Sequence, residues 1–428
     1  MVIMPYCRAP QGWQLDFKQH DPKHTQIIET QLIGSTLMSC FIRSALPFSS
    51  LTSFPVASCH GAGDDPLASG CWPARFFMWW NSVFPHPGSQ LTNGARRRTN
   101  SAYFSFCHGY HLPDETDLVI LDFDTEDDAP TEEVTMHFEQ LVRSILTRQD
   151  QPAVLVLGHF APQNQERFAF HGPEMAHTAV AQFYDVPHIS VKGAVYNEYI
   201  TNPEPFKSAF YADPVLANQR GHELLADVLI GYFQSQTCTG WSAILGHSFD
   251  VPLVLTDSTG AENAKGLFGG IRHAPEDSSE EKEPTMFNAG PYAALRVPPA
   301  RLGSRPHDLD KFRESEPFCA AADNLINPLP PSLFYGSGWH AHHPGKGMPE
   351  VHEDDTRHYW YSNLPKSKLR VPIKVGRGDI AVYYLEEGRK EEDVKKGVGS
   401  AVECWVDDNF NGKRRIENTF AGEGSRPK

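Results

Sequence analysis

Continuous apolar runs alternate with amphipathic segments through the middle of the chain. The runs TDLVILDFD (116–124) and PAVLVLGHF (152–160) are typical of strands buried on both faces of a parallel sheet. A shorter run, VPHISVK, covers 186–192. Apolar positions at helical spacing follow these runs at 131–148, 173–185 and 219–236. The alternation of strand and helix predicts an α/β fold with a parallel sheet and right-handed crossovers.

The pattern is different at both ends of the chain. Residues 1–56 show no clear period, so we expect a divergent or disordered N-terminal segment without a strand, followed by an α/β domain at 57–236 that opens with a helix at 71–84. Residues 237–290 are rich in Gly and acidic positions and predict a partly disordered linker. Short β-rich runs broken by Gly, Pro and Asp then predict an antiparallel β-sandwich domain at 291–428.

The net charge and the spacing of the cysteines oppose several classes of function. The 428 residues include 38 basic and 53 acidic residues, a net charge of −15, which opposes a nucleic-acid partner. No C-x-x-C occurs among the eight cysteines, so a zinc ribbon is not expected, and Cys319 and Cys404 are available to form one bridge in the C-terminal domain. No apolar run is long enough for a transmembrane helix, and the N-terminus shows no clear signal peptide.

Seven segments carry a family resemblance. They are CHGAGDDP (59–66), LTNGARRRTNSAYFSFC (91–107), DLVILDFDTED (117–127), YADPVLANQRGHELLADVL (211–229), NPLPPSLFYGSGW (327–339), HYWYSNLPKSKLRVPIKVG (358–376) and GSAVECWVDDN (399–409). Together they resemble the SGNH (GDSL-type) hydrolase superfamily and, more narrowly, its fungal capsular-associated group. The resemblance implies an esterase or acyl-transfer enzyme acting on cell-wall or capsule polysaccharide. It also implies a secretory or extracellular location and no cofactor.

In such esterases a Ser nucleophile follows the first strand, and a Gly and an Asn help to hold the oxyanion. Aligned on CHGAG, the Ser position falls on Pro55, and Ser58 lies nearby but out of register. The oxyanion Gly corresponds to Gly94, and the Asn position is Glu126. A carboxylate donates no hydrogen bond unless it is protonated, so the oxyanion site is altered.

The base of the family motif is altered as well. Asp213 is present, but the His expected three residues later is Leu216. His222 follows in the first turn of the last predicted helix and is the remaining candidate base. These changes leave two hypotheses open: an esterase with degraded catalytic motifs, and a catalytically inactive carbohydrate-associated scaffold.

A second group of polar residues lies in the C-terminal domain. It consists of His340, His342, His343, His352 and His358, with Glu353, Asp354 and Asp355. Imidazoles and carboxylates are zinc ligands, but no known spacing is matched, so a solvated loop is favoured over a metal site and no metal is assigned. The aromatic residues of this domain fit either a sugar-binding face or a sandwich core.

Overall fold

The computed structural model describes two regions of the chain. Of the α/β region it describes 50–55, 70–95, 99–127 and 129–244. Of the C-terminal region it describes 297–298, 300–306, 318–320, 335–342, 359–373, 380–396, 399–422 and 425–427. In the helices of these residues, no stretch is both long and apolar enough to cross a membrane.

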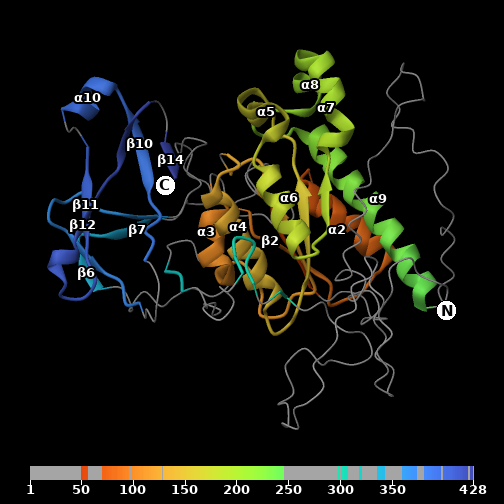
Figure 1. The fold of residues 1–428 in the computed structure, drawn as a ribbon, viewed down its shortest axis with the longest axis horizontal. Coiled ribbons are helices and arrows are strands. Elements are labelled where there is room, and N and C mark those ends of the chain that lie inside the picture. Colours follow the sequence, from red (N-terminus) through yellow and green to blue (C-terminus); the bar gives the residue numbers. More distant parts are fainter. Residues whose placement is uncertain are drawn as a thin grey trace, which may run out of the picture.

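A five-stranded sheet with the order β2-β1-β3-β4-β5 forms the centre of the α/β region, and all of its pairs are parallel (Figure 1). Its strands are β1 (Ser50–Pro55), β2 (Gln90–Asn93), β3 (Leu118–Asp122), β4 (Ala153–Gly158) and β5 (His188–Ser190). The parallel sheet with helical crossovers confirms the α/β fold that the hydrophobic pattern predicts.

Strand β1 corrects the expectation that residues 1–56 contain no strand. Ser50–Pro55 pairs with β2 on one side and with β3 on the other. The segment SLTSFP carries few apolar residues, so its pattern gives no strand signal. Backbone pairing along both edges stabilises it instead, which sequence periodicity does not report.

Helices cover both faces of the sheet. One layer consists of α2 (Trp72–Val83), α7 (Lys192–Thr201), α8 (Pro203–Phe210) and α9 (Gln219–Ile244). The other consists of α3 (Ser101–Cys107), α4 (Glu132–Leu146) and α6 (Glu174–Phe183). Along β3, Leu118 and Ile120 face the first layer, and Val119 and Leu121 face the second. This period of two buries both faces of a central strand.

Side-chain hydrogen bonds are made at the start of α4 and in the last part of α9. The hydroxyl of Thr131 accepts a hydrogen bond from the backbone N–H of Val134, as expected of the N-cap of α4. Helix α9 runs eight residues beyond the predicted end at 236, so that boundary falls inside a helix. Thr237 and Thr239 lie beyond that boundary, and their hydroxyls donate to backbone carbonyls four residues earlier, the bond that Thr commonly makes inside a helix.

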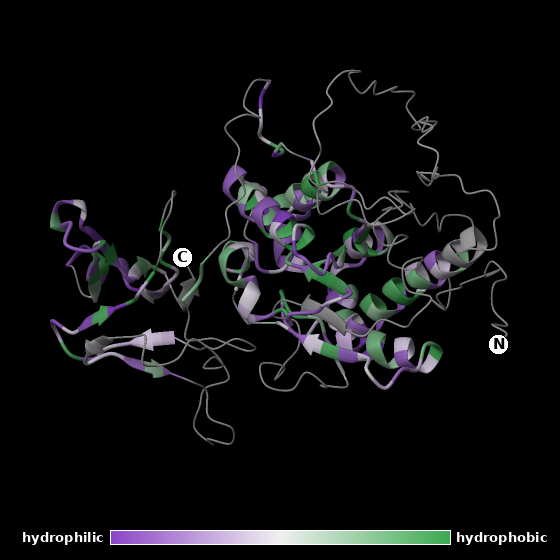
Figure 2. Ribbon diagram, turned by 90° about the horizontal axis from the view of Figure 1, so that it is seen from below, coloured by the Kyte–Doolittle hydropathy of each residue, from purple (hydrophilic) through white to green (hydrophobic). Residues whose placement is uncertain are grey.

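In the described part of the C-terminal region, short strands form four small sheets. They are β6 (Tyr335–Ser337) with β9 (Lys368–Arg370), β7 (His340–His342) with β8 (Tyr359–Tyr361), β11 (Ala401–Cys404) with β12 (Arg414–Glu417), and β10 (Leu385–Arg389) between β13 (Thr419–Ala421) and β14 (Ser425–Pro427). A short α-helix, α10 (Glu391–Lys395), and a 3-10 turn at Phe410–Gly412 lie between them. Figure 2 shows mixed hydropathy on these strands, in contrast to the hydrophobic central strands of the α/β region. The β-sandwich arrangement stays a prediction.

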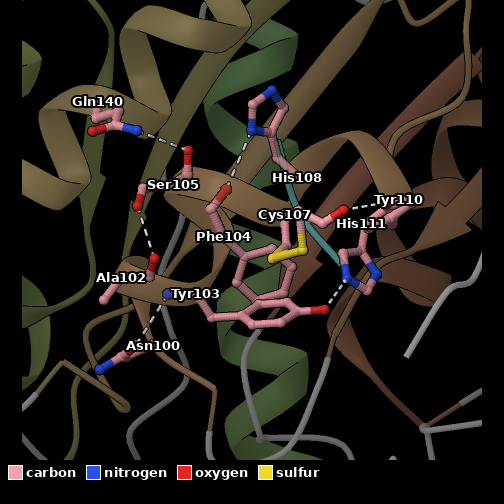
Figure 3. Close-up of a disulfide and its surroundings, with 11 residues drawn as sticks. Asn100, Ala102, Tyr103, Phe104, Ser105, Cys107, His108, Tyr110, His111 and Gln140 are labelled. Atoms are coloured by element: carbon pink, nitrogen blue, oxygen red, sulfur yellow. Dashed lines mark hydrogen bonds between the residues drawn. A yellow bond between two sulfur atoms is a disulfide. The ribbon is translucent and has the colours of Figure 1, made fainter. Parts of the chain in front are cut away.

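A disulfide joins the two regions and corrects the expected bridge between Cys319 and Cys404. Cys319 bonds to Cys107 at the end of α3 (Figure 3). Cys404 carries a free thiol. The hydroxyl of Tyr110 donates to the backbone carbonyl of Cys319. The Arg143 guanidinium of α4 also links the two regions, because it donates to the carbonyl of Pro298 at 2.6 Å. The sequence could not predict this pairing, because the two cysteines lie in different regions of the chain.

Candidate active site

The carboxyl ends of the central strands bring acidic and histidine side chains together. Asp122 is the last residue of β3 and is in register with Pro55, the last residue of β1. His159 directly follows Gly158, the last residue of the neighbouring strand β4. In open parallel sheets, ligands bind outside the carboxyl ends of the strands. This edge is therefore the candidate active site.

Asp122 and His159 form a buried pair. The Nδ1 atom of His159 lies 3.1 Å from Oδ2 of Asp122, and the indole N–H of Trp72 donates to the same oxygen at 3.2 Å. The side chain of His159 is 1% exposed and that of Asp122 is fully buried. A carboxylate only accepts hydrogen bonds, so Nδ1 is the donor, and in the neutral ring Nε2 then carries the lone pair. Among the described residues, Nε2 has no hydrogen-bond partner.

Tyr211 also lies at this part of the sheet edge. Its hydroxyl donates to the backbone carbonyl of Phe160, the residue after His159. Burial, and secondarily the Asp122 carboxylate, raises the pKa of Tyr211 well above its ordinary value. The phenol is therefore a neutral donor that fixes the backbone following β4.

A second histidine lies between two carboxylates. Nδ1 of His177, on α6, is 2.6 Å from Asp124, and its Nε2 is 2.7 Å from Asp127. Burial alone would lower the pKa of His177, but the hydrogen bonds to both carboxylates outweigh it and raise the pKa to about 10. Burial raises the pKa of Asp124 to about 6, against the effect of His177. Asp127 also accepts from the backbone and hydroxyl of Ser101, so the imidazolium ties together α6, α3 and the turn after β3.

A third polar group lies beside β4 and β5. The Lys192 ammonium is 2.6 Å from the carboxylate of Glu174. Although burial opposes it, Lys192 holds the pKa of Glu174 below its ordinary value. Burial lowers the pKa of the adjacent His188 to about 4, which leaves that ring neutral. A Cβ at Gly158 would lie 2.9 Å from the Glu174 carboxylate and from Ser190, so the glycine admits this ion pair to the end of β4.

The two predicted oxyanion residues both follow strands at this edge. Gly94 is buried directly after β2, and Glu126 is half-buried in the turn after β3. The backbone N–H of Glu126 donates to the carbonyl of Phe123 within that turn. Their roles at an oxyanion remain proposals.

The Asp213 motif has a different local structure from a catalytic Asp–His pair. Asp213 is exposed, and its Oδ1 accepts from the backbone N–H groups of Val215 and Leu216, each at 2.7 Å. The Leu216 side chain is buried in the apolar cluster between the sheet and α3, α4 and α6. His222 is buried in the first turn of α9, behind Asn218, which caps that helix. No hydrogen bond joins Asp213 to His222 among the described residues.

Two further expectations concern residues that are only partly described. Ser58 lies outside the described residues. Of the histidine-rich group, only His340 and His342 are described, and their rings pack against Tyr361 and Tyr359, with centroids 5.8 and 4.7 Å apart. Within the described parts of the chain, no group of three or more His, Cys, Asp or Glu side chains is placed to hold a metal ion.

Sequence reasoning missed His159 and His177. A signal for His159 was present, because a histidine directly after a buried strand stands at the functional edge of a parallel sheet. His177 gave a weaker signal, as one polar residue on the apolar face of a predicted helix. Its partners were visible as acids after β3, but their pairing with α6 depends on the tertiary fold.

No family model and no curated protein matches the chain, whereas several solved structures do. A two-domain esterase (CEX) active on acetylated mannans is 17% identical over 88% of this chain and 80% of its own, with a TM-score of 0.48. The same esterase co-crystallised with mannopentaose is 23% identical over 50% of this chain, with a TM-score of 0.38. This chain spans 53% of the length of that structure.

A member of the lipolytic G-D-S-L family from Veillonella parvula is 14% identical over 43% of this chain and 98% of its own, with a TM-score of 0.31. Solved structures similar to this chain thus include esterases of the SGNH/GDSL type. Similarity at this level concerns the fold, and one fold hosts many activities.

Proposed function

We propose that the chain is an SGNH-type ester hydrolase that removes acyl groups from a polysaccharide. The observation that carries the proposal is the buried Asp122–His159 pair at the carboxyl edge of the sheet, 3.1 Å from Oδ2 to Nδ1. An imidazole oriented by a carboxylate is the group with which ester hydrolases accept the proton of an attacking hydroxyl. Gly94, at the end of β2, is the proposed oxyanion donor on the same edge.

The substrate class rests on the motifs of the sequence. Their similarity to the fungal capsular-associated group supports a cell-wall or capsule polysaccharide as the acylated substrate. The net charge of −15 favours a neutral polysaccharide over a polyanion, because a negatively charged surface repels the latter. A secretory or extracellular location belongs to the same proposal.

Acetate release tests the activity. The full chain is incubated with O-acetylated mannan and O-acetylated xylan, and acetate is measured over time against heat-denatured protein. We expect linear release in proportion to protein concentration on at least one of the two polymers. Release equal to that of the denatured protein on both polymers would contradict the proposal.

The alternative is a catalytically inactive carbohydrate-associated scaffold. It is favoured by one observation, the Asp213 turn, in which the carboxylate binds its own backbone and Leu216 occupies the position of the base. A scaffold would be retarded by acetylated polysaccharide in affinity electrophoresis and would leave the acetyl groups in place. Retardation together with acetate release separates the enzyme from the scaffold.

A further inference from the structure

We propose that His159 is the general base of this site and replaces the histidine that the family motif expects at position 216. The inference rests on the proposed ester hydrolase activity. Leu216 has no proton acceptor, and its side chain is buried among apolar residues. The one acidic partner retained by that motif, Asp213, is engaged with its own turn. A base must therefore come from another element of the carboxyl edge.

His159 has the chemical features of a base. Oδ2 of Asp122 fixes Nδ1 as the donor, so in the neutral ring the lone pair of Nε2 is available to accept a proton. Buried polar atoms in folded proteins nearly always have partners, and a group without one calls for an explanation. Nε2 of His159 has none among the described residues, which is the state expected of a base between turnovers.

Asp122 is a positioning residue. It binds Nδ1 of His159 and the indole N–H of Trp72, so it is held by donors from β4 and from α2. It selects the tautomer of the ring and does not reach the reacting atoms. Its register with Pro55 puts the pair beside the end of β1, where the nucleophile of the family motif stands.

The reaction follows from this arrangement. The oxygen of a hydroxyl, from water or from a serine, bonds to the ester carbonyl carbon while its proton moves to Nε2 of His159, and the carbonyl π electrons move to the carbonyl oxygen. The bond between that carbon and the sugar oxygen then breaks, and the proton passes from Nε2 to the departing sugar oxygen. With water the products are the free acid and the sugar hydroxyl. With serine an acyl-enzyme forms first, and water releases it by the same two steps.

The test compares His159→Gln with wild type in the acetate-release assay. Glutamine keeps a nitrogen donor for Asp122 and removes the basic nitrogen. We expect kcat to fall by about 10²–10⁴-fold with KM little changed, since general base catalysis acts on the transition state. Asp122→Asn, which selects the wrong tautomer, is expected to lower kcat similarly and serves as a second variant. His108→Gln is the matched control, because His108 is a buried histidine in the turn that follows α3, outside the candidate active site.

Thermal unfolding of each variant separates a catalytic from a structural role, because only folded variants are compared. If wild type releases acetate and His159→Gln retains kcat within about tenfold, the inference fails while the proposed function stands. Loss of kcat in His222→Gln but not in His159→Gln would overturn it as well. If wild type itself releases no acetate, the proposed function fails first.

Discussion

Replacing His177 by glutamine removes the cation from a buried group of three charges. In the native fold its imidazolium lies 2.6 Å from Asp124 and 2.7 Å from Asp127, and the ring is fully buried. Glutamine is uncharged and carries both of its N–H donors on one nitrogen, whereas the imidazolium donates from two separate ring nitrogens. The variant therefore leaves buried negative charge without compensation.

The expected loss is large and depends on pH. Breaking a buried ion pair by removing one partner costs about 3–5 kcal/mol. The pKa of His177 is raised from 6.5 to about 10, so its stabilisation is complete below pH 6.5 and is lost as pH rises through 10. The pKa of Asp124, raised by burial to about 6, lets that carboxyl take up a proton in acid. The variant should therefore lose less stability at pH 5 than at pH 7.5.

Urea unfolding followed by tryptophan fluorescence measures this loss, because Trp72 and Trp80 are buried in the core of the same region. His171→Gln is the control, since His171 is an exposed histidine. We expect His177→Gln to lower the free energy of unfolding by about 3–5 kcal/mol at pH 7.5. A loss under about 1 kcal/mol, equal at both pH values, would refute the reasoning, because such a value is typical of an exposed ion pair.

Three other changes test the fold and the site. Cys319→Ser, which removes the Cys107–Cys319 disulfide and its loop with a sequence separation of 212, should lower the free energy of unfolding by roughly 2–5 kcal/mol, measured against wild type in urea. Phe233→Ala should cost about 3–5 kcal/mol in the same assay, because this ring is fully buried between α2 and α9. Leu216→His, which restores the family motif, should lower the thermal midpoint and leave acetate release unimproved, because it buries an imidazole in an apolar cluster while Asp213 stays bound to its own turn.

The sequence predicted those strands and helices whose burial is visible in the pattern of their own side chains. Strand β3, Leu118–Asp122, is buried on both faces, and a continuous apolar run reports that directly. Strand β1, Ser50–Pro55, was missed because its two neighbours stabilise it through the backbone. Helices α7 and α8 were missed because prolines and polar residues blur their spacing, although Pro203 occupies a first-turn position that helices accept.

The candidate site was only partly visible for a related reason. Gly94 and Glu126 were found by motif position, and both follow strands of the sheet. The partnership of Asp122 and His159 spans 37 residues and depends on β3 and β4 being neighbours. A motif compares residue types at fixed spacing, so it reported a missing base at Leu216 and could not report an imidazole at the end of another strand.

The tautomer of His159 is the feature on which the chemistry depends, and nitrogen NMR of histidine-labelled protein measures it directly. Comparison with His159→Gln assigns the two ring nitrogens in the wild-type spectrum. The account predicts a proton on Nδ1, shared with Asp122, and a bare Nε2 at pH 7.5. A proton on Nε2 with a bare Nδ1, or a ring protonated on both nitrogens at that pH, would contradict the assignment of His159 as the base.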